Sequence, residues 1–286
     1  LFSNLGTYLI DSPITLPFSV TFSLFGSDDT SSVTGVINLE DTTTPDIPAR
    51  TTLKATGNNN IFIIDDGVNN DADNSPLTAN QYSTVTFNNI DFLGCDTNCA
   101  TNGGIIFNKE YLTITNSVIA KGVASDKGGA IYNAADAVLS IKNSVLKLNR
   151  ADSGSAIFSE DANASLSSVL ITDNQTQTAS NGVITLNKTK KASPYAPINS
   201  LIENSTISGN KGIGLNVNQG IFVNNSTIVK NTVGINLNSG LPTVYNSIIA
   251  GNDTDCQSFA AIPADGKAYF PNNLSVINKG CPTTNV

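Results

Sequence analysis

The densest cluster of potential metal ligands is the segment DDGVNNDADN at residues 65–74. Calcium prefers carboxylate oxygens, and this short stretch supplies several of them. The spacing does not follow the twelve-residue order of an EF-hand loop, and clusters of Asp, Asn and Gly commonly form turns instead. We therefore expect no cofactor and a plain turn at Asp65, Asp66, Asp71 and Asp73, with calcium as the alternative.

Four cysteines could hold a metal ion or cross-link the chain: Cys95, Cys99, Cys256 and Cys281. An even number of cysteines in an exported protein suggests two disulfides. Proximity in sequence favours Cys95–Cys99 and Cys256–Cys281, although three pairings can be drawn. The alternative is a four-cysteine zinc site, which requires all four sulfur atoms around one ion.

Other chemistry is restricted by what the chain lacks. It has no histidine, methionine or tryptophan, and its only arginines are Arg50 and Arg150. The net charge of −8 would repel a phosphate backbone, so nucleic acid is not an expected partner. No apolar run reaches 18 residues, so we expect no membrane span.

The first 26 residues are apolar but are interrupted by Asp11, Pro13 and Pro17, which favours strands. No positively charged segment precedes them, and the sequence begins at Leu1. We therefore expect an exported chain whose signal peptide has been removed, secreted or located at the cell surface.

An internal repeat organises the rest of the chain. The segments FNNIDFLGC, ITNSVIAKG, IKNSVLKLN, LSSVLITDN, IENSTISGN, VNNSTIVKN and VYNSIIAGN begin at residues 87, 114, 141, 166, 202, 223 and 244. The differences between these numbers are 27, 27, 25, 36, 21 and 21 residues. A second motif, a glycine turn followed by an alternating apolar strand, accompanies each segment, as in GGIIFN at 103–108 and GGAIYN at 128–133.

Because no repeat has a helical period, we predict an all-β, right-handed parallel β-helix, in which each strand pairs with its counterpart one turn later. One apolar ladder would comprise Ile114, Ile141, Leu166, Ile202, Val223 and Val244. Another would comprise Ile119, Leu146, Ile171, Ile207, Ile228 and Ile249. Strands about 4.8 Å apart would separate Asn89 from Asn246 by about 29 Å, which is too far for one zinc ion.

The third position of the repeat is nearly always asparagine. We expect these residues to form a structural ladder, because a stacked asparagine can bond to its counterparts and to turn backbone groups. They are Asn89, Asn116, Asn143, Asn204, Asn225 and Asn246, with Ser168 in the same frame. A second ladder is expected at Asn149, Asn174, Asn210, Asn231 and Asn252.

These patterns divide the chain into three parts. Residues 1–50 would form an N-terminal apolar strand or cap segment, residues 51–255 the rungs of the helix, and residues 256–286 a C-terminal cap. A loop insertion at 187–200 accounts for the 36-residue interval. Such loops often make contacts, but we favour a solvated loop.

The motifs resemble those of known bacterial repeat proteins. LKLN at 146–149 after GGAI at 128–131 is similar to the repeats of chlamydial polymorphic outer-membrane proteins and autotransporter passengers. NSIIAGNDTDC at 246–256, with NNL at 272–274 and GC at 280–281, resembles the terminal rung of secreted right-handed parallel β-helix repeat proteins. This resemblance implies the fold, export and a C-terminal cap stapled by disulfide, but it implies little about activity.

Catalysis must be considered because parallel β-helices include polysaccharide hydrolases and lyases. The hydrolases of this fold use histidine together with clustered aspartates, and this chain has no histidine. Lyases need carboxylates beside an Arg or Lys base, yet no aspartate pair recurs beside Arg150. We expect no enzyme and no catalytic residues, and keep a lyase-like enzyme only as an alternative.

The expected function is a non-enzymatic, extracellular structural protein that self-associates, with a filament as one form. The apolar N-terminal strand could join subunits through Leu1, Phe2, Leu5, Tyr8, Leu9 and Ile10. The alternative is an adhesin that binds host or surface glycans through one face or the 187–200 loop. An exposed aromatic row would favour the adhesin, but the candidates do not obviously align: Tyr111, Tyr132, Phe158, Tyr195 and Tyr245.

Overall fold

The computed structural model describes residues 6–23, 51–67, 83–95, 97, 99–188, 200–238, 242–257, 274–275 and 281. Within these residues the protein contains strands and no helix. Three long sheets and two short ones account for all the strands.

Sheet A has ten described strands: β1 (Gly6–Ile10), β4 (Thr51–Ala55), β7 (Ile90–Leu93), β11 (Val118–Ala120), β15 (Val145–Lys147), β19 (Leu170–Thr172), β23 (Thr206–Ser208), β26 (Thr227–Val229), β29 (Ile248–Ala250) and β31 (Leu274–Ser275). Sheet B has nine: β2 (Ile14–Leu16), β5 (Phe62–Ile64), β9 (Ile106–Asn108), β13 (Ile131–Asn133), β17 (Ile157–Glu160), β21 (Gly182–Asn187), β24 (Ile213–Val217), β27 (Val233–Leu237) and β30 (Thr254–Gln257).

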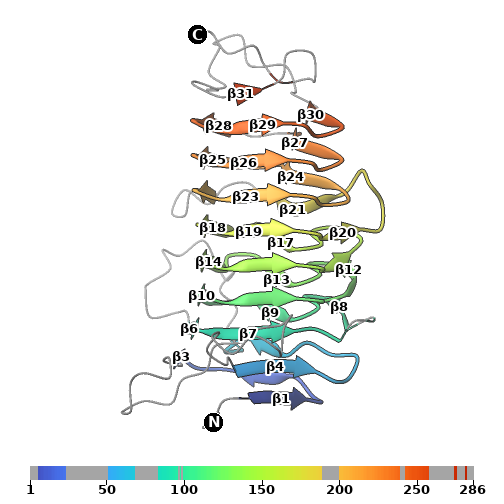
Figure 1. Ribbon diagram of the computed structural model, residues 1–286. Helices are drawn as coiled ribbons and strands as arrows, with labels where there is room; N and C mark the ends of the chain where they lie inside the picture. The colour runs from blue at the N-terminus through green and yellow to red at the C-terminus, as the bar shows by residue number, and fades with distance from the viewer. Residues whose placement is uncertain are drawn as a thin grey trace, which may run out of the picture.

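Sheet C has eight described strands: β3 (Val20–Ser23), β6 (Thr84–Asn88), β10 (Tyr111–Thr115), β14 (Val138–Lys142), β18 (Asn163–Ser167), β22 (Ser200–Glu203), β25 (Ile221–Asn224) and β28 (Pro242–Tyr245). The two short sheets pair β8 (Ala100–Asn102) with β12 (Ala124–Lys127) and β16 (Arg150–Ala151) with β20 (Gln175–Thr176). The short strands widen the corner between sheets A and B in the middle turns (Figure 1).

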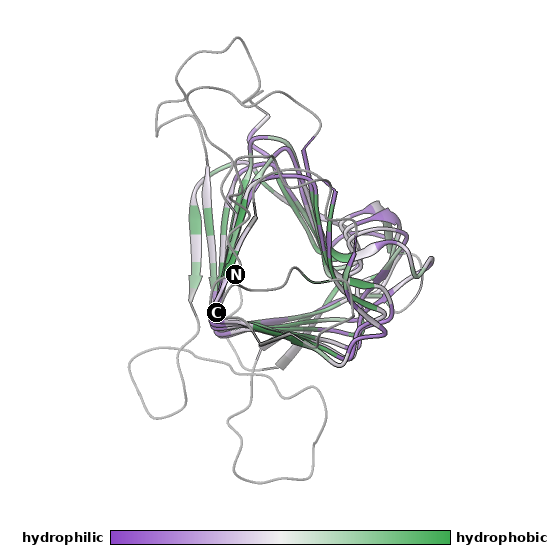
Figure 2. Cartoon of the chain, turned by 90° about the horizontal axis from the view of Figure 1, so that it is seen from above, coloured by the Kyte–Doolittle hydropathy of each residue, from purple (hydrophilic) through white to green (hydrophobic). Residues whose placement is uncertain are grey.

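The predicted parallel β-helix is confirmed. Each turn contributes a strand to sheet A, then to sheet B, then to sheet C, and all the long-sheet pairings are parallel. The chain climbs as a right-handed coil from the N-terminal to the C-terminal end (Figure 1). Seen along the axis, the strands of each side lie nearly on top of one another around a three-sided core (Figure 2), so the sheets have little twist.

Both predicted apolar ladders are confirmed in register. In sheet C, Ile114 pairs with Ile141, and the column continues through Leu166, Ile202, Val223 and Val244. In sheet A, Ile119 pairs with Leu146, and the column continues through Ile171, Ile207, Ile228 and Ile249. Every member of both columns is buried, so the period-two alternation of the sequence directly forms the core.

The N-terminal turns have a different core. Phenylalanine rings from all three sheets meet there: Phe62 lies 4.8 Å from Phe87 between ring centroids, 6.2 Å from Phe22 and 6.3 Å from Phe92. The Phe87 ring also stacks on Phe22 at 5.2 Å. The described part of the N-terminal segment supplies the first turn, because β1, β2 and β3 pair in parallel with β4, β5 and β6.

The third-position asparagines occupy the corner between sheets C and A. Their shared feature is a left-handed backbone conformation, with φ between 48° and 59° at Asn89, Asn116, Asn143, Ser168, Asn204, Asn225 and Asn246. Asparagine tolerates this conformation better than other residues with a side chain, apart from aspartate. Asn116 and Asn246 donate side-chain hydrogen bonds to Asn88 and Asn224, which lie outside that frame. The motif therefore marks a shared corner conformation, and the predicted ladder of stacked side chains stays a prediction.

The serine that follows the corner forms a ladder that we did not predict. The Ser117 hydroxyl accepts from the N–H of Ile90, and the Ser144 hydroxyl accepts from the N–H of Ser117. Ser205, Ser226 and Ser247 repeat the pattern higher up. Each hydroxyl also donates to the carbonyl two residues before it, so a buried backbone group is satisfied on either side.

The second asparagine set does form a side-chain ladder. The amide of each residue donates to the amide oxygen one turn above, from Asn149 through Asn174, Asn210 and Asn231 to Asn252, at 2.8–3.1 Å. Asn252 then donates to the buried carboxylate of Asp255 at 2.9 Å. Because all the amides point the same way, an acceptor-only carboxylate is suited to the last position.

The paired glycines of the second motif have distinct roles. Gly128 has φ of +68°, a conformation that only glycine adopts easily. A side chain at Gly129 would place its first carbon 2.2 Å from the carbonyl oxygen of Ser155 in the next turn. The glycine turn therefore allows neighbouring turns to approach closely.

Candidate functional site

The four cysteines form two disulfides, with the pairing favoured by sequence proximity. Cys95 is bonded to Cys99, beside the corner where the short strands begin. Cys256 in β30 is bonded to Cys281, with Cα atoms 4.7 Å apart. All four cysteines are used, so a four-cysteine zinc site is ruled out and the C-terminal segment is stapled to the last turn of sheet B.

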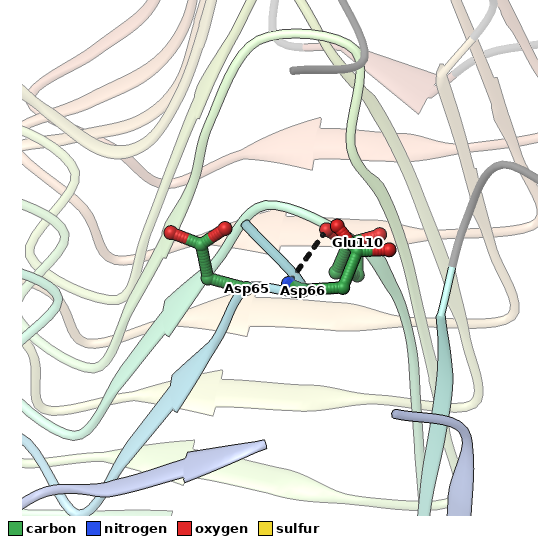
Figure 3. A group of neighbouring side chains, drawn as sticks. All are labelled: Asp65, Asp66 and Glu110. Carbon is green, nitrogen blue, oxygen red and sulfur yellow. Dashed lines mark hydrogen bonds between the residues drawn. The ribbon is translucent and has the colours of Figure 1, made fainter. Parts of the chain in front are cut away.

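The candidate calcium site is only partly described. Asp65 and Asp66 follow β5, and the structure adds Glu110, which precedes β10 and was not predicted (Figure 3). One ligand atom of each of these three residues lies within 4.8 Å of the others. Asp71 and Asp73 lie outside the described residues, so the structure does not test the predicted set of four aspartates.

Glu110 has a structural role in this cluster that does not require a cation. Glu110 is fully buried, and its carboxylate accepts from the N–H of Asp66 at 3.3 Å and from the N–H of Ser83 at 3.1 Å. Its own N–H donates to Asn108, which bonds to Asn133 in the next turn. Glu110 therefore ties together the chain on both sides of residues 68–82.

Asp65 has a cation of its own. Burial alone would raise the pKa of the Asp65 carboxyl, but the Lys109 ammonium at 2.5 Å and the N–H of Gly67 outweigh burial and lower it. The Lys109 ammonium also lies 6.0 Å from the centre of the Phe107 ring. The Lys109 ammonium therefore already neutralises part of the negative charge of the cluster, which weakens the attraction of the cluster for calcium.

An aromatic column runs up the outer side of sheet B. Tyr132 pairs in register with Phe107 below and Phe158 above, with ring centroids 5.1 and 5.9 Å away. The sequence analysis expected no aligned row, but two of its candidates, Tyr132 and Phe158, do align, and the structure adds Phe107, which was not among them. Tyr132 and Phe158 are only 8% and 4% exposed, however, so these two rings offer little surface to a ligand.

Polar side chains seal the outer edge of this column. The Tyr132 hydroxyl donates to Glu160, which also pairs with Lys127 at 3.2 Å, and the Lys127 ammonium lies 4.9 Å from the Phe158 ring centre. Burial, together with the Glu160 carboxylate, raises the pKa of Tyr132 far above its usual value. A tyrosine held in its protonated form does not act as a base at neutral pH, so this group is better suited to packing than to proton abstraction.

The first turn contains the described part of the predicted assembly segment. Of those residues, Ile10 is buried, Tyr8 is half-buried, and Leu9 is 65% exposed. Phe18, between β2 and β3, is 58% exposed. Leu1, Phe2 and Leu5 lie outside the described residues, as does most of the loop insertion, from 189 to 199.

The fold and these sites define the chain as a disulfide-bonded parallel β-helix protein. No protein-family model, curated protein or solved structure matches this chain. The resemblance to bacterial β-helix repeat proteins therefore stays a prediction. Among the described residues, no helix is long and apolar enough to cross a membrane.

Proposed function

We propose that this protein is an extracellular structural protein whose copies associate end to end through the first turn of the β-helix. The observation that carries the proposal is that, among the described residues, the strands at that end pair on one side only and exposed apolar side chains lie beside them. The two disulfides support a location outside the cytoplasm, where such bonds persist.

The first turn offers three strand edges. Among the described residues, β1, β2 and β3 each pair on one side only, with β4, β5 and β6. At the other end, β28 and β30 likewise pair on one side only. Unpaired edges are templates for another chain, and the ends of a parallel coil present strands of the same direction. The first turn of one copy can therefore extend the last turn of another by parallel pairing.

The apolar residues at this end favour association over exposure to water. Leu9 and Phe18 are the two most exposed large apolar side chains of the described structure, and both belong to the first turn. Joining two different ends gives a heterologous contact, which produces a filament when the rotation does not close into a ring. This is the assembly expected of a structural role.

The adhesin alternative gains no support from the aromatic side chains. The column of Phe107, Tyr132 and Phe158 is aligned, but its upper two rings are buried. Tyr111 and Tyr245 lie in sheet C and are not register partners, because Tyr111 pairs with Thr84 and Val138 and Tyr245 pairs with Asn224. We therefore propose the structural role and do not propose the adhesin.

The test places charge at the proposed contact. We expect wild-type protein to form filaments or defined oligomers, and Leu9→Arg or Phe18→Glu to reduce assembly at least about tenfold, because a charge beside a strand edge opposes pairing with another chain. Leu148→Glu is the matched control, since Leu148 is 42% exposed and follows β15 in the middle turns of the rod. Light scattering and negative-stain microscopy measure the outcome. A wild-type rod that stays monomeric, or equal loss in the control, would refute the proposal.

A further inference from the structure

The outer face of sheet A changes character toward the C-terminal end. The first residue of each upper strand points outward, and together these residues form one column: Leu170, Thr206, Thr227 and Ile248, which pair in register one turn apart. The third residue of each of these strands also points outward and forms a second column: Thr172, Ser208, Val229 and Ala250. We call these two columns on β19, β23, β26 and β29 the upper A face. None of its residues carries a charge.

The absence of charge distinguishes this face from the lower part of sheet A and from sheet C within the described structure. Lower on sheet A, the corresponding outward positions include Lys54 and Lys147, and the outer side of sheet C includes Lys142 and Glu203. In a protein of net charge −8, like-charged copies repel one another at most surfaces. The upper A face is a place where two copies can meet without opposing or desolvating charges.

The first column also has a self-complementary order. Its outer members, Leu170 and Ile248, are apolar and are 37% and 40% exposed, and its two inner members are threonines. A two-fold axis between Thr206 and Thr227 would set each threonine against the other threonine of a second copy. The same axis would place Leu170 against the second copy's Ile248. A two-fold interface requires this kind of self-complementarity, since the same patch faces itself.

We propose that the upper A face is a lateral contact that packs against the same face of a second copy of this chain. Flat sheets with small and β-branched side chains pack face to face at about 10 Å, as in stacked sheets. The inference rests on the proposed self-association but uses a different surface: end contacts lengthen a filament, whereas this face joins filaments side by side.

The size of the face sets the strength of the contact. Three steps of about 4.8 Å give a column only about 14 Å long. This is smaller than a standard interface of about 800 Å² per partner, so an isolated pair is expected to be weak. Along aligned filaments the contact repeats, and many weak contacts act together.

The experiment uses full-length protein carrying Leu9→Arg, which removes the end contact. On this background T206K/T227K and T206E/T227E each place like charges across the proposed interface. We expect the parent to dimerise at high concentration in sedimentation velocity, and each double variant alone to bind at least about tenfold more weakly. An equimolar mixture of the two double variants should restore dimers, because opposite charges then face each other.

The matched control is S165K/S167K, which adds the same charge to the outer side of β18 in sheet C and should leave dimerisation unchanged. A parent that is monomeric up to about 1 mM would overturn the lateral contact, as would dimers that persist in both double variants. Neither result bears on the end contact, which is measured separately with an unmodified upper A face. Failure of the lateral contact and failure of the proposed function are thus distinguishable.

Discussion

The two ends of the β-helix reach the same architecture with different side chains. In the N-terminal turns, Phe62, Phe87 and Phe92 fill the interior from three sheets. In the C-terminal turns the core is aliphatic, and polar ladders of serine and asparagine line two corners. The repeat is also shorter there, with 21 residues separating Asn204 from Asn225 and Asn225 from Asn246.

This difference shows which parts of a solenoid must be periodic. A polar ladder works only when every turn has the right residue at the right corner, because a missing partner leaves a buried group unsatisfied. An aromatic cluster has no such requirement, since rings of different sheets can interlock without regular spacing. The C-terminal turns are therefore regular in sequence, and the N-terminal turns need not be.

The largest expected effect comes from the aromatic core. Phe62→Ala should destabilise the protein by about 3–5 kcal/mol, because the cavity would lie among three other rings. Ile235→Val, in the aliphatic core of the same sheet, should cost only about 0.5–1.5 kcal/mol. Urea unfolding gives the totals. Because each turn contacts only its neighbours, hydrogen exchange should show the loss in β4–β7 and not in β24–β27.

A result in which Phe62→Ala costs no more than Ile235→Val would mean that the rings are not the main stabilising element of the N-terminal turns. Uniform loss of exchange protection along the rod would instead show that the two ends unfold as one cooperative unit. In either case the contrast between the ends would disappear.

The polar ladder of the C-terminal turns provides the next test. Asn210 accepts from Asn174 and donates to Asn231 and to the carbonyl of Ile171. Asn210→Ala would leave several of these buried groups unsatisfied, so we expect a loss of about 3 kcal/mol. The measurement is again the free energy of unfolding.

Asn204 is the matched control, since it lies six residues earlier at an exposed corner with φ of 50°. Asn204→Gly should change stability by less than about 0.5 kcal/mol, because glycine accepts this conformation. Asn204→Ala should cost about 1 kcal/mol, because alanine does not. If Asn204→Gly proved as costly as Asn210→Ala, the corner side chains would form a ladder after all, as the repeat first suggested.

The sequence predicts the architecture well because the core positions recur with little variation. Ile114 and its counterparts can be aligned by inspection, and the same alignment gives the register of sheets C and A. It does not separate two causes at Asn89 and its counterparts, since a recurring asparagine can report either a backbone conformation, which the structure shows, or a side-chain ladder, which stays a prediction. The Ser117 ladder was overlooked because serine is also common in plain turns.

The candidate site was harder to predict, because its members come from different turns. Glu110 lies 44 residues from Asp66, and nothing in the spacing of the acidic segment indicates that the two meet. Phe107, Tyr132 and Phe158 align only once the second motif is given its register in sheet B. Local pattern identifies strands and corners, whereas a site on a solenoid depends on how residues stack across turns.

The smallest expected effect comes from the ion pair at the N-terminal acidic cluster. Asp65 has a pKa below its ordinary value of 3.8, mainly because Lys109 and the N–H of Gly67 outweigh its burial. A carboxyl whose pKa falls on folding adds stability that is fully present above its ordinary pKa. That stability is lost as the pH falls through the lower folded value. Both side chains are partly exposed, so the pair should contribute only about 0.2–1 kcal/mol at pH 7.

A double-mutant cycle with Asp65→Asn and Lys109→Gln isolates this coupling from the contact between Lys109 and Phe107. The coupling should be constant from neutral pH to about pH 5, should shrink below the ordinary pKa of the carboxyl, and should fall with added salt. A coupling that persisted at pH 2 would show that the pair acts through packing instead of charge. Bound calcium would displace Lys109 from Asp65, so a cycle repeated with calcium would reveal it as a lower coupling at neutral pH.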